Sequence, residues 1–244
     1  MKNLYSLVLI IFISSISLGQ ARRHGVATGI APWTPSSYYY SSAVSNLYIT
    51  LNPYAKNKEF ANYTGSPYLE SKKFEIGRIT NTIENKIYQF LIRYNIFRDI
   101  IEIQKSENSF INLRKLNCFK ISIYKKKFEL LTYKTTKNKT KTGYLEVLLN
   151  RKKSTLYKKY TVTLTPAKKA KSSYETDHPA RFNKSYSYFY KLNTEILEIP
   201  KKKKLFINIF GDKSQQIKKF IKSKKLKPTR ENDLIKIFNY YNTL

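Results

Sequence analysis

The sequence predicts a mainly β protein: an antiparallel meander, rolled or partly closed into a barrel, with a C-terminal α-helical hairpin. Between residues 74 and 166, apolar residues recur with a period near two, in runs of strand length. Very short polar turns such as Lys125-Lys126 separate several runs, and short connections imply antiparallel neighbours. Near the C-terminus the apolar period changes to that of a helix.

The expected strands share this alternation and are bounded by polar turns. They cover residues 78–83, 87–94, 100–104, 118–124, 127–133, 144–149 and 156–164, with later candidates at 186–192 and 204–210. Residues 166–185, which include the basic segment 168–171, are expected to form a loop. The alternating polar positions suit a sheet with one face in water.

Residues 211–244 predict a helical hairpin that covers one end of the sheet. Asp212 is expected to cap the first helix, with Gln215 at the N3 position of a capping box. After Pro228, Thr229 is expected to cap the second helix. Each helix carries one apolar face, formed by Ile217, Phe220 and Ile221 in the first and by Leu234, Ile235, Phe238 and Tyr241 in the second.

Residues 1–19 predict a secretory signal peptide. Lys2 gives a short basic start, residues 4–18 form an almost unbroken apolar run, and Gly19 is a small residue at the exit. The run of about 15 residues is shorter than the roughly 20 that a permanent membrane helix needs. We therefore expect an exported protein that is periplasmic, associated with the outer membrane, or secreted, with no transmembrane span in the mature chain.

Three parts are expected after the signal peptide. Residues 20–66 form an irregular arm that contains Tyr, Ser and Pro, with one strand candidate at 47–51. Residues 67–210 form the antiparallel β domain, and residues 211–244 form the helical hairpin packed on it. The arm could add a strand to the sheet edge of a partner protein through backbone pairing.

The chain is strongly basic, with 46 Lys and Arg against 16 Asp and Glu, a formal net charge of +30 at pH 7. Such a surface attracts polyanions. For an exported protein these are lipid headgroups, acidic glycans, extracellular nucleic acid and acidic proteins. Compositional drift explains the charge equally simply, because the abundant Lys, Asn, Ile, Tyr and Phe have AT-rich codons. The sequence leaves both explanations open.

Basic runs interleaved with aromatic residues are the strongest functional signal. A basic groove with stacking rings binds single-stranded nucleic acid, and acidic glycans or lipid headgroups can use the same features. The alternative is a solvated charged face at the margin of a Tyr-rich core. The candidate residues for binding a polyanion or a partner are Tyr124, Lys125, Lys126, Lys127, Tyr157, Lys158, Lys159, Tyr160, Lys201, Lys202, Lys203 and Lys204.

The residues that metal and catalytic sites need are scarce. Cys118 is the only cysteine, which excludes an intramolecular disulfide and a multi-cysteine zinc site. Glu175, Asp177 and His178 share one loop, but adjacent loop residues rarely meet in working geometry, so ordinary surface charges are the simpler interpretation. No nucleophile-elbow, zincin or P-loop motif is present. We expect no catalytic, cofactor-binding or metal-binding residues and no cofactor.

Three stretches of the chain carry a family-like pattern: residues 74–79 with 91–103, residues 143–149 with the tyrosines at 186–190, and residues 217–242. With them, the chain from about residue 64 to 244 resembles a group of uncharacterised secreted proteins of the Bacteroidota, especially Flavobacteria and their relatives. The resemblance implies a secreted or envelope β-rich protein. It does not extend to the arm and supplies no activity.

Together, these features predict an exported, non-enzymatic binding or structural protein of the bacterial cell envelope. Its expected partner is a protein of the outer membrane or periplasm. The alternative is a polyanion-binding protein that uses Lys/Tyr-rich hairpins to bind acidic glycan, lipopolysaccharide or extracellular nucleic acid. A hydrolase is a second, weakly supported alternative.

Overall fold

A computed structural model describes residues 48–49, 63–107, 109–172 and 174–244. All of the described residues belong to one compact unit. The predicted signal peptide and most of the predicted arm lie outside the described residues. Among the residues that are described, no helix has the length and apolar character that crossing a membrane requires.

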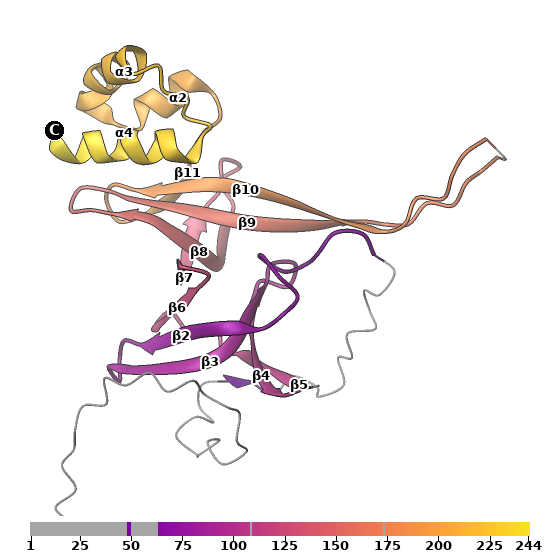
Figure 1. The fold of residues 1–244 in the computed structure, drawn as a ribbon. Helices are drawn as coiled ribbons and strands as arrows, with labels where there is room; N and C mark the ends of the chain where they lie inside the picture. The colour runs from indigo at the N-terminus through magenta and orange to yellow at the C-terminus, as the bar shows by residue number, and fades with distance from the viewer. Residues whose placement is uncertain (1–47, 50–62, 108, 173) are drawn as a thin grey trace, which may run out of the picture. The chain divides into compact units, whose positions relative to one another are not determined.

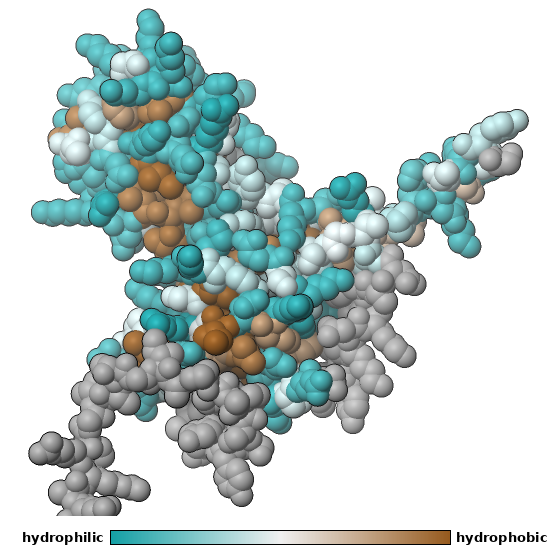
Figure 2. All heavy atoms as spheres, viewed as in Figure 1, coloured by the Kyte–Doolittle hydropathy of each residue, from teal (hydrophilic) through white to brown (hydrophobic). Residues whose placement is uncertain are grey.

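Within the described residues, a single β sheet precedes a group of helices (Figure 1), and hydrophilic residues cover most of the described surface on the face shown in Figure 2. Its strands are β1 (Tyr48–Ile49), β2 (Glu75–Asn81), β3 (Lys86–Asn95), β4 (Ile100–Ser106), β5 (Ser109–Leu113), β6 (Phe119–Ile123), β7 (Lys126–Lys134), β8 (Thr140–Asn150), β9 (Thr155–Thr165), β10 (Arg181–Lys191) and β11 (Ile196–Glu198). The helices are α2 (Lys203–Asn208), the 3-10 helix η3 (Gly211–Lys213), α3 (Ser214–Ser223) and α4 (Glu231–Thr243). The predicted fold class, mainly β with helices at the C-terminus, is confirmed.

The sheet is antiparallel almost throughout. In the described part of the chain its order is β1-β5-β4-β3-β2-β6-β7-β11-β10-β9-β8. The contact between β11 and β7, at Leu197 and Lys134, is parallel. Strand β8 pairs with β7 as well as with β9, so the C-terminal half of the sheet curls back toward its own middle. The sheet is rolled, as predicted, without closing into a barrel.

Side-chain alternation along the strands builds the cores. In β7, Phe128 and Leu130 are buried and the residues between and beside them are more exposed. These two residues belong to a core formed mainly by β2–β8, with Val162 of β9 and Phe182 of β10. A second core joins β8, β9 and β10 to the helices. Members of the second core include Leu156, Tyr190, Phe206, Ile217 and Phe238.

Strand β1 lies in the predicted arm and pairs with β5 of the same chain. Tyr48 is opposite Leu113, and Ile49 is opposite Asn112. The strand candidate at 47–51 is therefore a strand at two of its residues. This part of the arm therefore covers the β5 edge of its own sheet. An unpaired edge strand would invite pairing with other chains.

The hairpin formed by β9 and β10 is longer than predicted. Its pairing runs from Thr155 opposite Lys191 to Thr165 opposite Arg181, and Figure 1 shows its tip projecting beyond the sheet. Residues 181–185 were predicted as part of a loop, which is wrong, since they begin β10 and bury Phe182. Strands β5 and β11, which are short, were not predicted.

The C-terminal region contains one more helix than predicted. Residues 204–210 were predicted as a strand, but most of them form α2, so this prediction is wrong. Phe206, Ile207 and Phe210 are all buried. This spacing, with two adjacent residues and one four residues after the first, places the three side chains toward one face of a helical turn, whereas a strand would separate Phe206 from Ile207.

The predicted helix caps are also wrong. Helix α3 begins at Ser214, two residues after the predicted cap Asp212, which lies in η3. Helix α4 begins at Glu231 after Arg230, and neither N-cap residue makes a side-chain capping bond. Instead, the Asp233 carboxylate accepts a hydrogen bond from the Lys227 amide at 2.9 Å, which ties the first turn of α4 to the preceding loop.

Candidate anion-binding surface

The β6–β7 hairpin, which carries the first predicted Lys/Tyr motif, borders a hollow of about 680 Å³. We call this hollow the basic groove. Side chains from β6, β7 and β8 line it, and its charged residues are Lys120, Lys125, Lys126, Lys127, Glu129 and Glu146. Three of the four predicted residues of this hairpin therefore lie at one hollow.

The basic groove holds more positive charge than its acids neutralise. Each acid has a lysine partner, in the pairs Lys120–Glu129 (3.3 Å) and Lys126–Glu146 (3.4 Å). Lys125 and Lys127 are exposed and make no ion pair within the described residues. Two ammonium groups in the groove are thus available to an anionic ligand.

The turn that presents these lysines has an unusual backbone. Tyr124 and Lys125 both have positive φ, 52° and 61°, as in the two-residue hairpin turn that favours Asn-Gly. For residues with a side chain, this conformation costs roughly 1–2 kcal/mol each. Such strain often gathers at functional sites. The Tyr124 ring is partly buried against the core, so it supports the turn and does not present a free stacking face.

A series of Glu, Tyr and Lys side chains runs from the basic groove across β8, β9 and β10; we call it the Lys/Tyr ladder. Tyr160 Oη donates a hydrogen bond to Glu146 Oε2 at 2.7 Å. Lys158 Nζ lies 4.9 Å from the centre of the Tyr160 ring and 4.7 Å from that of Tyr186. Lys158 Nζ also donates to Glu231 of α4 at 2.6 Å. The second predicted motif is thus linked to the first through Glu146.

The phenols of the ladder are hydrogen-bond donors at neutral pH. Burial, followed by the hydrogen bond to Glu146, raises the pKa of Tyr160. Burial, followed by the charge of Glu231, raises the pKa of Tyr188, whose hydroxyl lies 3.3 Å from that carboxylate. These hydrogen bonds hold the carboxylates of Glu146 and Glu231. The two acids therefore compete less with an incoming anion for the lysines.

The other half of the second motif faces away from the ladder. Side chains alternate along a strand, so Tyr157 and Lys159 point to the face of β9 opposite Lys158 and Tyr160. Tyr157 is buried in a small core with Tyr133 and Phe189. Lys159 is 9% exposed. These two predicted residues therefore do not belong to the binding surface.

Lys159 instead belongs to a partly buried ionic cluster around Asp99, whose side chain is 20% exposed. Lys159 Nζ and Tyr94 Oη each donate to Asp99 Oδ1 at 2.5 Å, and Lys115 Nζ lies 3.6 Å from Asp99 Oδ2. Burial lowers the pKa of Lys159, and the charge of Asp99 opposes this shift. A Cβ added at Gly143 would lie 2.6 Å from Asp99 Oδ2, so glycine leaves the space that this cluster occupies.

The third predicted motif, residues 201–204, is exposed and lies where the chain enters α2. Lys201 and Lys203 line a second pocket, of about 430 Å³, that Tyr186 and Tyr188 also line; we call it the apolar pocket. Lys202 and Lys204 do not line it. Since Tyr186 also contacts Lys158, the third motif adjoins the far end of the Lys/Tyr ladder.

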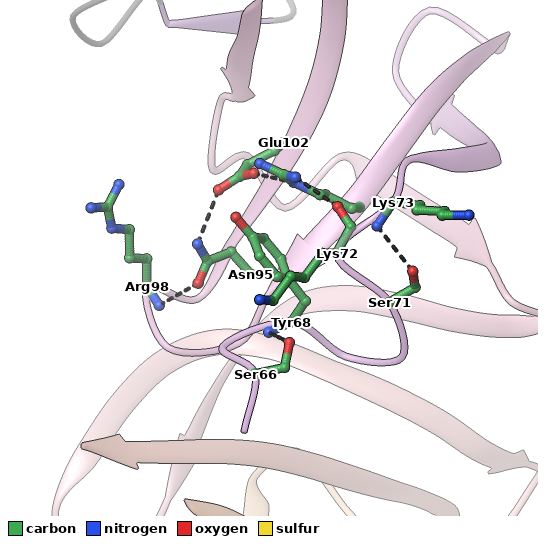
Figure 3. Close-up of polar contacts among 9 residues, drawn as sticks. Ser66, Tyr68, Ser71, Lys72, Lys73, Asn95, Arg98 and Glu102 are labelled. Atoms are coloured by element: carbon green, nitrogen blue, oxygen red, sulfur yellow. Dashed lines mark hydrogen bonds and ion pairs between the residues drawn. The ribbon is translucent and has the colours of Figure 1, made fainter. Parts of the chain in front are cut away.

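Strands β3 and β4 carry a buried ion pair that was not predicted from the sequence (Figure 3). Arg93 Nε donates to Glu102 Oε2 at 2.5 Å, and Asn95 Nδ2 donates to Glu102 Oε1 at 3.0 Å. The Arg93 and Glu102 side chains are 5% and 1% exposed. Arg93 Nη1 donates to the Lys72 carbonyl at 2.7 Å, which binds the segment before β2 to the sheet.

Aromatic rings surround the same guanidinium. Arg93 Cζ lies 4.3 Å from the ring centre of Tyr68, 4.2 Å from that of Phe74 and 5.0 Å from that of Phe110. These contacts enclose the cation and leave it away from solvent. We assign the Arg93–Glu102 pair a structural role, because it joins segments of the fold and borders neither the basic groove nor the apolar pocket.

In the loop that contains Glu175, Asp177 and His178, both carboxylates accept hydrogen bonds from backbone amides. Asp177 Oδ1 accepts a hydrogen bond from the Ala170 amide at 2.7 Å, and Glu175 Oε2 accepts one from the Lys171 amide at 3.2 Å. His178 pairs through its backbone with Lys168. Within the described residues, neither carboxylate is hydrogen-bonded to the His178 ring, and no group of three or more His, Cys, Asp or Glu side chains is placed to hold a metal ion.

Comparisons with protein-family models, curated proteins and solved structures found no match to this chain.

Proposed function

We propose that this protein is an exported binding protein for an acidic glycan, which lies along the basic groove and the Lys/Tyr ladder. The observation that carries the proposal is the link between two basic motifs that are far apart in sequence. Lys125 and Lys127 lie at the groove without ion-pair partners in the described chain, and Glu146 connects that groove to Tyr160 beside Lys158. Export is inferred from the signal-peptide pattern of residues 1–19.

The balance of rings and charges favours a glycan over single-stranded nucleic acid. Nucleic-acid binding by stacking uses successive free aromatic faces. In the described ladder, Tyr186 is 56% exposed, whereas Tyr160 and Tyr188 are partly buried and hydrogen-bonded to carboxylates. We therefore expect charge contacts with the carboxylate or sulfate groups of a glycan to dominate its binding. The Tyr186 ring is available to contact one sugar face.

A protein partner in the cell envelope is the other function that the sequence predicts. The proposed route was strand addition by the arm to a partner's sheet. Residues Tyr48–Ile49 of the arm pair with β5 of this chain. A partner's sheet would have to displace that pairing or use a different part of the arm, so we favour the glycan.

The test is titration of the mature protein with an oligogalacturonate, using dextran sulfate, neutral dextran and a dT oligonucleotide as comparison ligands. The variant Lys125→Gln/Lys127→Gln removes the two unpaired charges of the groove. We expect binding of the acidic glycan to weaken between about twofold and thirtyfold, from roughly 0.2–1 kcal/mol for each exposed ion pair. Affinity of the unmodified protein should fall steeply between 0.05 and 0.5 M salt, since charge contacts are screened.

A matched control is Lys218→Gln/Lys222→Gln, which removes two exposed charges from α3. Equal weakening by the control would mean that net charge alone attracts the ligand, and would overturn the proposed surface. Affinity independent of salt, or equal affinity for neutral dextran, would also overturn it. Tighter binding of the dT oligonucleotide than of either acidic glycan would reassign the surface to nucleic acid.

A further inference from the structure

We propose that the apolar pocket binds an amphipathic anion, a molecule with one unbranched apolar chain and one anionic head. This inference does not depend on the glycan proposal, because it rests on a different hollow. The pocket lies between β10, the segment that joins β11 to α2, and the loop before α4. Its volume of about 430 Å³ is within the range of small-molecule sites.

The walls of the pocket suit an apolar chain. Ile199, Pro200, Phe206 and Pro228 line it, and Phe206 is 1% exposed because it is also part of the helical core. The Tyr188 ring lies alongside, with its hydroxyl turned to Glu231. A chain seated here would exchange water for apolar side chains, which is the main source of affinity in such sites.

The charges at the pocket suit an anionic head. Lys201 and Lys203 are exposed lining residues, and neither makes an ion pair within the described chain. The one acid in the lining, Glu198, already accepts hydrogen bonds from Thr136, at 2.9 Å from the amide and 3.3 Å from the hydroxyl. With two lysines against this one carboxylate, the net charge of the lining is positive, which favours a carboxylate or phosphate over an ammonium head.

The experiment is calorimetric titration of the mature protein with octanoate, decanoate and dodecanoate below their micelle concentrations. We expect the affinity to rise roughly fourfold for each added methylene group until the chain fills the pocket. Decyl phosphate tests the second source of an anionic head, and tighter binding of one decyl compound assigns the head as phosphate or carboxylate. Decyltrimethylammonium carries the same chain with the opposite charge and should bind at least tenfold more weakly.

Two variants of equal charge separate the pocket from the general basic surface. Lys201→Gln/Lys203→Gln should weaken decanoate binding at least threefold, whereas Lys202→Gln/Lys204→Gln should leave it unchanged, because only the first pair lines the pocket. Thr229→Trp places a large ring at the lining and should block the chain. Equal effects of the two lysine variants, affinity independent of chain length, or equal binding of the ammonium compound would overturn the proposal.

The glycan proposal can fail without affecting this one. Lys125→Gln/Lys127→Gln alters the basic groove alone, so decanoate binding should be unchanged in that variant. Loss of decanoate binding there would show that the two hollows are not independent, and would overturn the assignment of the head to Lys201 and Lys203.

Discussion

The buried Arg93–Glu102 pair makes a quantitative prediction about stability. Glu102→Leu would leave the Arg93 guanidinium 5% exposed without a counter-charge and would remove the hydrogen bonds from Arg93 and Asn95. Removing one partner of a buried ion pair costs about 3–5 kcal/mol. Arg93→Met should cost a similar amount, because it leaves the carboxylate of Glu102 buried.

The double variant Arg93→Met/Glu102→Leu should cost less than the sum of the single variants. Replacing both buried charges with apolar side chains is often close to neutral. Here the Asn95 amide and the Lys72 carbonyl lose partners, so we expect a residual cost of about 1–3 kcal/mol. The single variants together cost about 6–10 kcal/mol, which predicts a coupling free energy of at least about 3 kcal/mol.

The assay is urea unfolding of the protein followed by far-UV circular dichroism. With a slope of about 2–3 kcal/mol per molar urea, each single variant should lower the midpoint by roughly 1–2.5 M. Additive effects, with the double variant matching the sum within about 0.5 kcal/mol, would refute the reasoning. That result would mean that the pair is solvated in solution.

Three further predictions concern Gly143, Lys125 and a pair of buried tyrosines. Gly143→Ala should lower the free energy of unfolding by about 1–3 kcal/mol, because its Cβ would lie 2.6 Å from Asp99 Oδ2. Unchanged stability in urea would show that the Asp99 side chain can move aside without a cost in free energy. Lys125→Gly should raise the free energy of unfolding by about 1 kcal/mol by relieving a φ of 61°, and a lower urea midpoint would show that the turn is unstrained. Burial raises the pKa of Tyr68 and that of Tyr133 to about 12. Unfolded phenols ionise near 10, so the folded state holds more protons between about pH 10 and 12, and stability should fall with rising pH in that window. Tyr68→Phe/Tyr133→Phe should make this fall shallower in urea titrations at successive pH values, and an identical pH slope would contradict the assignment.

Strand positions were predictable where local alternation determines them. In β7, buried Phe128 and Leu130 alternate with more exposed neighbours, and the turn before them is two residues long. Helix α2 was not predictable in this way. Its apolar residues Leu205, Phe206 and Ile207 form a short run that fits either a strand or a helix, and packing of Phe206 against the helical core decides between them.

The site was predictable in its residue types and only partly in its geometry. Alternation indicates that Lys158 and Lys159 face opposite sides of β9, but it does not say which side is closed by other segments. That depends on Asp99, which reaches Lys159 from the turn after β3. The Arg93–Glu102 pair required the register of β3 and β4, in which these residues are directly opposite. Two opposite charges inside neighbouring apolar runs were the available signal.

The order of strands in the sheet has a consequence for folding kinetics. Most pairings join strands that are consecutive in the chain, and such hairpins form quickly because their loops close at small entropic cost. The parallel contact of Leu197 with Lys134 is different, because β8, β9 and β10 intervene between its strands. We expect it to form after those hairpins, so Leu197→Ala should mainly accelerate unfolding and give a φ-value near zero. A φ-value near one would place β11 in the folding nucleus. With a φ-value near zero, β11 is the last strand to join the rolled sheet during folding and the first to leave it during unfolding.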